Sequence, residues 1–302
     1  MFLHEDKELF QDVLEATSVS QNNRPIPIIE KDYYVTMILK LLSEEALGCV
    51  FKGGTSLSKC HHVIDRFSED IDITFSDTLT QGQRKNLKDK IIAGISQKLQ
   101  LPITDWDNAR SKRDYNCYTF AYNPVEGFVQ TSLVPGVKME VSLGSTSFPT
   151  VQLPVSSYVY EYLSKENMNI VDEYGLHPFT MTLQSLERTF ADKVFAICDY
   201  YLQGKTKRHS RHIYDLYMLL PHITLNDEYK ALVAEIRAHR AKMQICPSAQ
   251  PEVNINEILD RIIQEDVYRA DYNEITSYFQ NHPIEYNEVI SALKEIIKTN
   301  IF

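Results

Sequence analysis

The first half of the chain alternates between two spacings of hydrophobic and polar positions. Where apolar residues recur every three or four positions, the pattern predicts amphipathic helices, at residues 5–16, 30–43 and 86–99. Glu30 and Asp32 would then stand in the first turn of the second helix, where negative charge is favourable. Short apolar or alternating runs predict strands at residues 49–51, 70–75, 115–122 and 137–143.

The second half, after about residue 180, has an almost entirely helical pattern. Leu183 to Leu202 reads as one long amphipathic helix, and Gly204 follows it as a C-terminal stop. Further helices are expected at residues 209–220, 226–242, 254–266 and 285–298. The sequence therefore predicts an α+β (mixed α/β) protein. A small mixed sheet is expected in an amino-terminal domain, residues 1–165, followed by a helical carboxy-terminal domain, residues 166–302.

Composition favours a soluble, cytoplasmic protein. With 302 residues and 43% hydrophobic side chains, the chain can bury a sizeable core. The amino terminus is interrupted by charges and resembles neither a signal peptide nor a transit peptide. The apolar run from Val35 to Leu42 is too short for a membrane span, so no membrane partner is expected. Five scattered cysteines without a CxxC pair argue against both a disulfide framework and a zinc site of that type.

The charge distribution leaves a nucleic-acid partner open. A net charge of −10 argues against a protein that coats nucleic acid, but a local basic patch can still bind it. One patch lies at Lys205, Lys207, Arg208, His209, Arg211 and His212, and a second at Arg237, Arg240 and Lys242. Both patches are equally well interpreted as solvated surface.

A diglycine segment, Phe51 to Lys59 (FKGGTSLSK), is the first candidate for chemistry. Gly53 and Gly54 after an apolar strand let the backbone turn sharply and approach a ligand closely. Thr55 and Ser56 follow at what should be a helix amino terminus, where free N–H groups favour phosphate. The same pattern also suits an ordinary strand-to-helix connection.

An acidic pair follows shortly after this turn. Asp70 and Asp72 are two residues apart on a predicted strand, so both carboxylates project from one face while Ile71 and Ile73 pack on the other. Two neighbouring like charges repel unless a cation lies between them, and Mg²⁺ prefers such oxygen ligands. The alternative is an exposed edge strand with acidic residues on its solvent side.

A third carboxylate, Glu140, lies out of phase with the apolar residues of its own strand. If that strand neighbours the one carrying Asp70 and Asp72, the three carboxylates converge. They could then hold two Mg²⁺ ions that bind a triphosphate and activate an acceptor hydroxyl. An ordinary solvent-facing glutamate is the competing interpretation.

Together these residues resemble the nucleotidyltransferase (polymerase β-like) superfamily. The runs FKGGTSLSK and RFSEDIDI, with the latter starting at Arg66, are more closely similar to the AbiEii/AbiGii-type toxins of bacterial type IV toxin–antitoxin and abortive-infection systems. Further similarity lies in EKDY at Glu30, in ERTFADK at Glu187 and in RHIYDLY at Arg211. The resemblance implies a nucleotidyltransferase fold for the amino-terminal domain.

The resemblance also implies roles for later residues. It adds Lys193 and Asp215 to Asp72 as catalytic residues, with Lys193 contacting the triphosphate. By helical spacing Lys193 lies at the edge of the apolar stripe, apart from the solvent side of Arg188, Asp192 and Asp199. It either extends to solvent or points into a cleft. By spacing alone, Asp215 could simply form an exposed ion pair with Arg211.

Other polar residues near the motifs are assigned to the nucleotide or left open. Lys52 and Lys59 flank the turn and either touch phosphates or are solvated, and Arg66 and Ser68 either brace the acidic strand or meet the triphosphate. His61 and His62 are adjacent, so they are interpreted as packing or surface residues and not as a metal pair.

The leading hypothesis is an Mg²⁺-dependent enzyme that transfers a nucleotide from an NTP to an acceptor, with the tRNA 3′ end expected. The basic segment at 205–212 would then guide the RNA backbone. The resemblance implies a separately encoded antitoxin, which need not form a stable complex with the toxin. The alternatives are an inactive NTP-binding module that acts through a protein partner, transfer to a protein hydroxyl, or phosphotransfer. The sequence does not indicate the NTP, the acceptor's identity or the oligomeric state.

Overall fold

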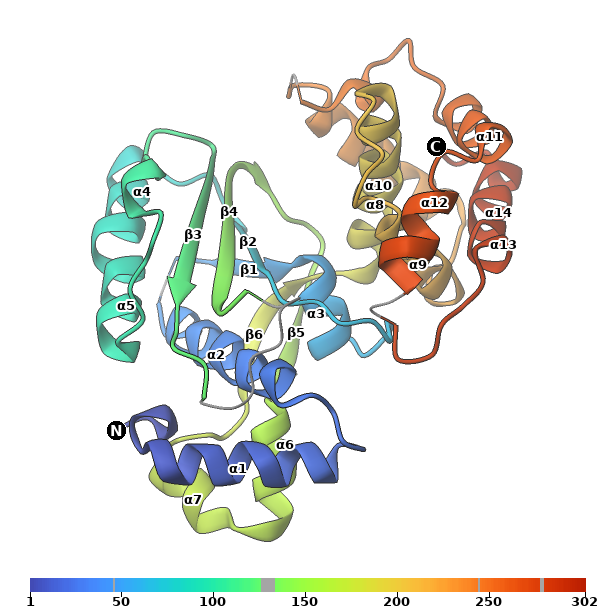
Figure 1. Ribbon diagram of the computed structural model, residues 1–302. Coiled ribbons are helices and arrows are strands. Elements are labelled where there is room, and N and C mark those ends of the chain that lie inside the picture. Colours follow the sequence, from blue (N-terminus) through green and yellow to red (C-terminus); the bar gives the residue numbers. More distant parts are fainter. Residues whose placement is uncertain (46, 126–133, 244, 278–279) are drawn as a thin grey trace. The chain divides into compact units, whose positions relative to one another are not determined.

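The computed structural model describes residues 1–45, 47–125, 134–243, 245–277 and 280–302 (Figure 1). The chain divides into two compact units. The first comprises Met1–Cys60 and Ser68–Leu183, and the second comprises His61–Phe67 and Gln184–Phe302. The domain boundary expected between residues 165 and 166 stays a prediction.

The first unit contains a mixed sheet, with six strands among its described residues in the order β3-β4-β2-β1-β6-β5. The strands are β1 (Cys49–Lys52), β2 (Ile71–Phe75), β3 (Tyr115–Ala121), β4 (Gly136–Thr146), β5 (Thr150–Val155) and β6 (Phe179–Gln184). β2 is antiparallel to β1 and parallel to β4, whereas β3 is antiparallel to β4. Because β2 lies between two neighbours, interpreting Asp70 and Asp72 as part of an exposed edge strand is wrong.

The helices of the first unit are α1 (Lys7–Ser20), α2 (Ile26–Ser43), α3 (Gly53–Lys59), α4 (Gln81–Asn86), α5 (Ala93–Leu99), α6 (Tyr158–Glu166) and α7 (Met168–Glu173). A π-helical turn at Leu87–Ile92 joins α4 to α5. α2 begins directly after Pro25, four residues earlier than expected. Glu30 and Asp32 therefore lie in the second turn, and the expectation that they favour the first turn of the helix is wrong.

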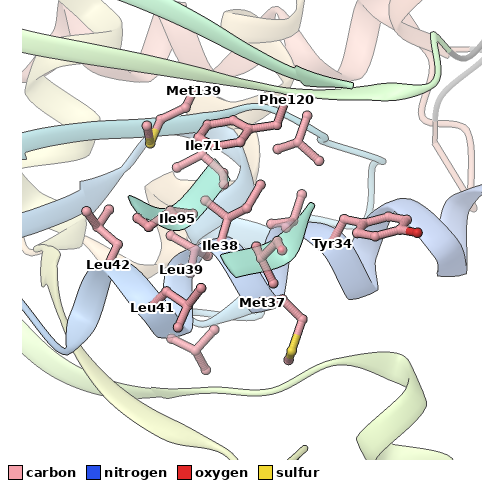
Figure 2. Close-up of a cluster of buried hydrophobic side chains, with 14 of the residues drawn as sticks. Tyr34, Met37, Ile38, Leu39, Leu41, Leu42, Ile71, Ile95, Phe120 and Met139 are labelled. Carbon is pink, nitrogen blue, oxygen red and sulfur yellow. The ribbon is translucent and has the colours of Figure 1, made fainter. Parts of the chain in front are cut away.

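The core of this unit lies between one face of the sheet and the helices α2 and α5 (Figure 2). Ile71 of β2, Phe120 of β3 and Met139 of β4 face the same cluster, together with Ile38 of α2 and Ile95 of α5. Burying each large apolar side chain contributes about 1.5–3 kcal/mol. Since strand side chains alternate between faces, the intervening polar residues of β2, β3 and β4 share the opposite face.

The second unit is helical in its described part. Its helices are α8 (Leu186–Leu202), α9 (Arg211–Leu219), α10 (Asp227–Arg240), α11 (Ile255–Glu265), α12 (Arg269–Asp271), α13 (Tyr286–Val289) and α14 (Ser291–Thr299). α8 packs against α9, α10 and α11. It starts later than expected because Leu183 still belongs to β6, and Ser185 caps the helix by accepting a 3.2 Å hydrogen bond from the Arg188 N–H. Gly204, at φ +66°, follows the helix as expected.

The face of α8 that was expected to be solvated is covered. Arg188 and Asp199 are buried, and Arg240 of α10 pairs with Asp192 at 3.0 Å and with Asp199 at 2.9 Å. Arg237 donates to the carbonyl oxygen of Gln250 at 2.8 Å. The second basic patch of the sequence is therefore largely engaged inside this unit.

No helix in the described part of the chain is long and apolar enough to cross a membrane. All five cysteines are free thiols in the structure.

Candidate active site

Four polar side chains form a row across the sheet of the first unit, on the face opposite the core. Asp72 of β2 pairs in register with Lys52 of β1 on one side and with Glu140 of β4 on the other. Cys117 of β3 lies opposite Glu140. The condition on which the acidic site depended is therefore met, because the strand of Glu140 neighbours the strand of Asp72.

Asp70 lies just before this row, because β2 begins at Ile71. Asp70, Asp72 and Glu140 are each partly accessible. In the described part of the chain, no three or more His, Cys, Asp or Glu side chains are already gathered as a metal-ligand group. The sheet thus brings the three carboxylates to neighbouring positions without closing them into a ligand shell.

Gly53 brings the backbone against the carboxylate of Asp72. It has φ +80°, a conformation that residues with a Cβ rarely adopt. A Cβ built on Gly53 would lie 2.0 Å from Oδ2 of Asp72. The diglycine turn therefore brings the backbone close to the acidic row and is more than an ordinary strand-to-helix connection.

Two residues that the sequence analysis did not select hold Glu140. Lys138, two residues earlier on β4, forms an ion pair with its carboxylate. The Tyr115 hydroxyl is hydrogen-bonded to Glu140, while the tyrosine side chain stays 51% exposed. The signal for Lys138 was available, since its spacing from Glu140 places both on one strand face.

These contacts perturb both partners of Glu140. Burial raises the pKa of Tyr115, and the nearby charge of Glu140 raises it further. Burial lowers the pKa of Lys138, but the hydrogen bond to Glu140 and the charges of Glu140 and Asp70 outweigh it, so the net shift is upward. Lys138 is therefore firmly protonated and supplies positive charge at the acidic row.

The hydroxyls expected to meet phosphate make contacts within the protein. Thr55 donates to Oγ of Ser68 at 3.0 Å, and Ser56 donates to the carbonyl oxygen of Gly53 at 2.9 Å. Lys59 is nearly buried and pairs with Asp32 of α2. These contacts brace α3 and the segment that leads into β2.

A second charged cluster, within the second unit, surrounds Asp215 of α9. Asp215 is fully buried (0% exposed) and receives hydrogen bonds from Arg66 Nε at 2.7 Å, Arg66 Nη2 at 2.8 Å and Lys193 Nζ at 2.6 Å. Asp215 is therefore not part of an exposed pair with Arg211. Arg66 and Lys193, both assigned to the nucleotide on the sequence, meet at this carboxylate.

Electrostatics fix the protonation states of this cluster. Burial would raise the pKa of the Asp215 carboxyl, but Arg66 and Lys193 together hold it well below its usual range. Burial lowers the pKa of Lys193, and the charge of Asp215 offsets only part of that shift.

His61 contacts the carbonyl oxygen of Gln184 at 3.2 Å and His62 is exposed, as the packing or surface interpretation predicted.

The sequence matches a known protein family over most of its length. The sequence model of the family described as nucleotidyl transferase AbiEii toxin, type IV TA system, matches residues 38–292. The chain belongs to this family. The AbiEii match spans the diglycine turn, the acidic row and the Asp215 cluster, whereas the EKDY element precedes it.

Among solved structures, this AbiEii toxin is similar to MenT4, a nucleotidyltransferase toxin from Mycobacterium tuberculosis H37Rv. The two are 16% identical, with a TM-score of 0.49, and the alignment covers 95% of this chain and 89% of that chain. No curated protein matches the sequence. The family match confirms the resemblance to AbiEii toxins, and the mixed sheet followed by helices confirms the expected fold class.

Proposed function

We propose that this AbiEii toxin is an Mg²⁺-dependent enzyme that transfers a nucleotide from an NTP to the 3′ end of a tRNA. The observation that carries the proposal is the register of β2 with its neighbours, which places Asp72 beside Glu140 and against Gly53. A nucleotidyltransferase needs carboxylates next to a backbone approach for phosphate, and this face provides both.

Asp70, Asp72 and Glu140 are the residues that would hold Mg²⁺. Their donor chemistry fits, because Mg²⁺ takes carboxylate oxygens and is usually held by a few of them together with substrate phosphates. Bound there, Mg²⁺ would neutralise phosphate charge and favour ionisation of the acceptor hydroxyl. Glu140 pairs with Lys138 through one carboxylate oxygen, and a carboxylate has further acceptor positions that could ligate an ion.

The nucleotide would lie along the diglycine turn. Gly53 and Gly54 provide the close backbone approach, and Lys52 lies beside Asp72 in the same row. Because the Thr55 and Ser56 hydroxyls are engaged within the protein, we assign these residues to phosphate through their backbone N–H groups. Lys59, which pairs with Asp32, and Ser68, which accepts a hydrogen bond from Thr55, would support the turn.

The cluster around Asp215 holds fixed positive charge within the second unit. Arg66 and Lys193 together carry one more charge than Asp215 neutralises, and both side chains are held by short hydrogen bonds. We assign Lys193 as the catalytic cation, as the family resemblance implies. Asp215, enclosed between the two cations, acts as the residue that positions them.

The acceptor would bind at the loop before α9. Lys205, Lys207, Arg208 and Arg211 are exposed there. The loop is held in one conformation by Asp271, which accepts hydrogen bonds from the Ser210 N–H at 3.0 Å and the Ser210 hydroxyl at 2.6 Å. Exposed cations grouped in one segment of a protein with net charge −10 fit an RNA backbone. Membership of a type IV system also implies an antitoxin gene partner, which need not bind the toxin stably.

Radiolabelled nucleotides test the transfer reaction. Purified protein, Mg²⁺ and each α-³²P-labelled NTP in turn are incubated with total RNA. One of the four nucleotides is expected to label a band of tRNA size, and the Asp72→Ala variant is expected to label none. Parallel reactions contain γ-³²P-labelled NTPs, and label that passes only from the γ-phosphate would indicate phosphotransfer. Label in protein alone would indicate a protein hydroxyl acceptor. Identical results for wild type and Asp72→Ala would refute the proposal.

RNA binding is tested separately in the Asp72→Ala background, which removes turnover. The double substitution Lys207→Gln with Arg208→Gln is expected to weaken binding and to flatten its salt dependence, since each lost phosphate contact lowers the slope by roughly 0.7–0.9. Lys298→Gln, which removes an exposed lysine on α14, is the matched control. An unchanged slope in the double variant would exclude this loop.

A further inference from the structure

Three consecutive charged residues of α2, Glu30, Lys31 and Asp32, are withdrawn from solvent. Glu30 is 1% exposed and Lys31 is 3% exposed. Charged side chains are almost never fully buried unless they are paired. Most of the other residues of α2 pack in the apolar core. The partners of these polar side chains therefore show which parts of the protein they fix in place.

Lys31 links the segments that lead into two strands of the acidic row. Its ammonium forms an ion pair with Glu69, the residue immediately before Asp70. The same ammonium donates to the carbonyl oxygen of Val134 at 3.2 Å, just before β4. One buried cation therefore contacts the entries to β2 and β4, the strands that carry Asp72 and Glu140.

Asp32 holds the C-terminal end of α3, the diglycine helix that begins at Gly53. One carboxylate oxygen pairs with Lys59, the last residue of α3, and the other accepts a 2.9 Å hydrogen bond from the Tyr158 N–H at the start of α6. Within α3, Thr55 donates to Ser68, which precedes Glu69 in the chain. The contacts of Lys31 and Asp32 thus enclose both the turn and the acidic segment.

We infer that Lys31 and Asp32 are positioning residues that hold the acidic segment and the diglycine helix in register for nucleotide transfer. The inference rests on the proposed function, but its contacts are independent of the substrate. A buried ion pair is weak evidence for stability, because desolvation offsets much of the attraction. Buried Lys31 and largely buried Asp32, each directed at a different part of the site, are better explained by geometry than by stability.

Lys31→Met tests the inference, with Lys40→Met as the matched control. Lys40 lies on the same helix and donates to the carbonyl oxygen of Gly175, away from the acidic segment. The Tm of both variants is expected to fall by a similar amount. Only Lys31→Met is expected to lower kcat by about 100-fold, because a misplacement of about 1 Å can cost that much. KM for the NTP should change less than kcat.

Lys31→Arg and the exchanged pair, Lys31→Glu with Glu69→Lys, are expected to recover part of the lost kcat. Glu69→Gln is the second route, since Glu69 is partly exposed and its substitution is the milder risk to folding. It should reproduce the loss seen in Lys31→Met, and combining the two should add little because they remove one interaction. Equal kcat losses in Lys31→Met and Lys40→Met, or additive losses in the double variant, would overturn the inference.

Hydrogen exchange separates this inference from the proposed function. Lys31→Met is expected to speed amide exchange in the segment around Glu69 and Asp70, and Lys40→Met is not. This readout needs no substrate, so it still tests the brace if wild-type protein transfers no nucleotide to any acceptor. Unchanged exchange around Glu69 in Lys31→Met would refute the brace even if transfer is confirmed.

Discussion

Gly53 gives the sharpest test of how the turn and the acidic row are built. Gly53→Ala would place a methyl group 2.0 Å from Oδ2 of Asp72, well inside any contact distance. The backbone at φ +80° also disfavours alanine by about 1–2 kcal/mol. The carboxylate of Asp72 must therefore move, and Asp72 is the central residue of the acidic row.

The expected result is a modest loss of stability together with a large loss of activity. The backbone strain alone corresponds to a fall in Tm of roughly 2–8 °C. Displacing Asp72 by about 1 Å is expected to lower kcat by about 100-fold. Activity is measured as transfer from an α-³²P-labelled NTP, and Tm by circular dichroism on the same preparations.

Gly175→Ala is the matched control. Gly175 has φ +61° in the same unit, so alanine is strained there too, but the nearest atom to its Cβ is Nζ of Lys40 at an ordinary 3.7 Å. It should lose a similar Tm and keep its kcat. The reasoning is refuted if Gly53→Ala and Gly175→Ala retain the same activity.

Two further predictions concern buried charge. Asp215→Asn leaves Arg66 and Lys193 without their shared carboxylate, so urea unfolding should show a free energy of unfolding lower by about 3–5 kcal/mol. The control, Asp172→Asn at an exposed position, should change it by no more than about 0.5 kcal/mol. A similarly small change for Asp215→Asn would show that the buried carboxylate does not hold the two cations. Burial raises the pKa of Glu30 to about 7, from 4.5. Because the unfolded carboxyl ionises first as pH rises, stability is lost between these two values. Glu30→Gln should therefore match wild type near pH 4 and be more stable at pH 8 by on the order of 2–3 kcal/mol; an effect that does not vary with pH would contradict this.

The sequence predicted the faces of the strands better than their neighbours. The alternation of Ile71, Asp72 and Ile73 correctly placed the carboxylate opposite the core, because the period of two in a strand is a local property. The pairing of Asp72 with Glu140 depends on which strands become neighbours. That choice is made by long-range packing, so the sequence could state it only as a condition.

The same limit explains the contacts that the sequence did not reveal. Arg66 and Asp215 are 149 residues apart in the chain, and no local pattern connects them. Lys59 was expected at the phosphates, but Asp32 on another helix engages it. The early start of α2 changed the interpretation of Glu30 and Asp32. They lie one helical turn further into the helix than expected, where both make contacts within the protein.

Metal binding tests the central claim most directly. Mn²⁺ can replace Mg²⁺ and be counted by electron paramagnetic resonance, with a non-hydrolysable NTP analogue present. Wild type is expected to bind two Mn²⁺ ions, Asp72→Asn to bind neither tightly, and Glu140→Gln to bind more weakly than wild type. Equal stoichiometry and affinity in all three proteins would show that these neighbouring carboxylates do not share the ions.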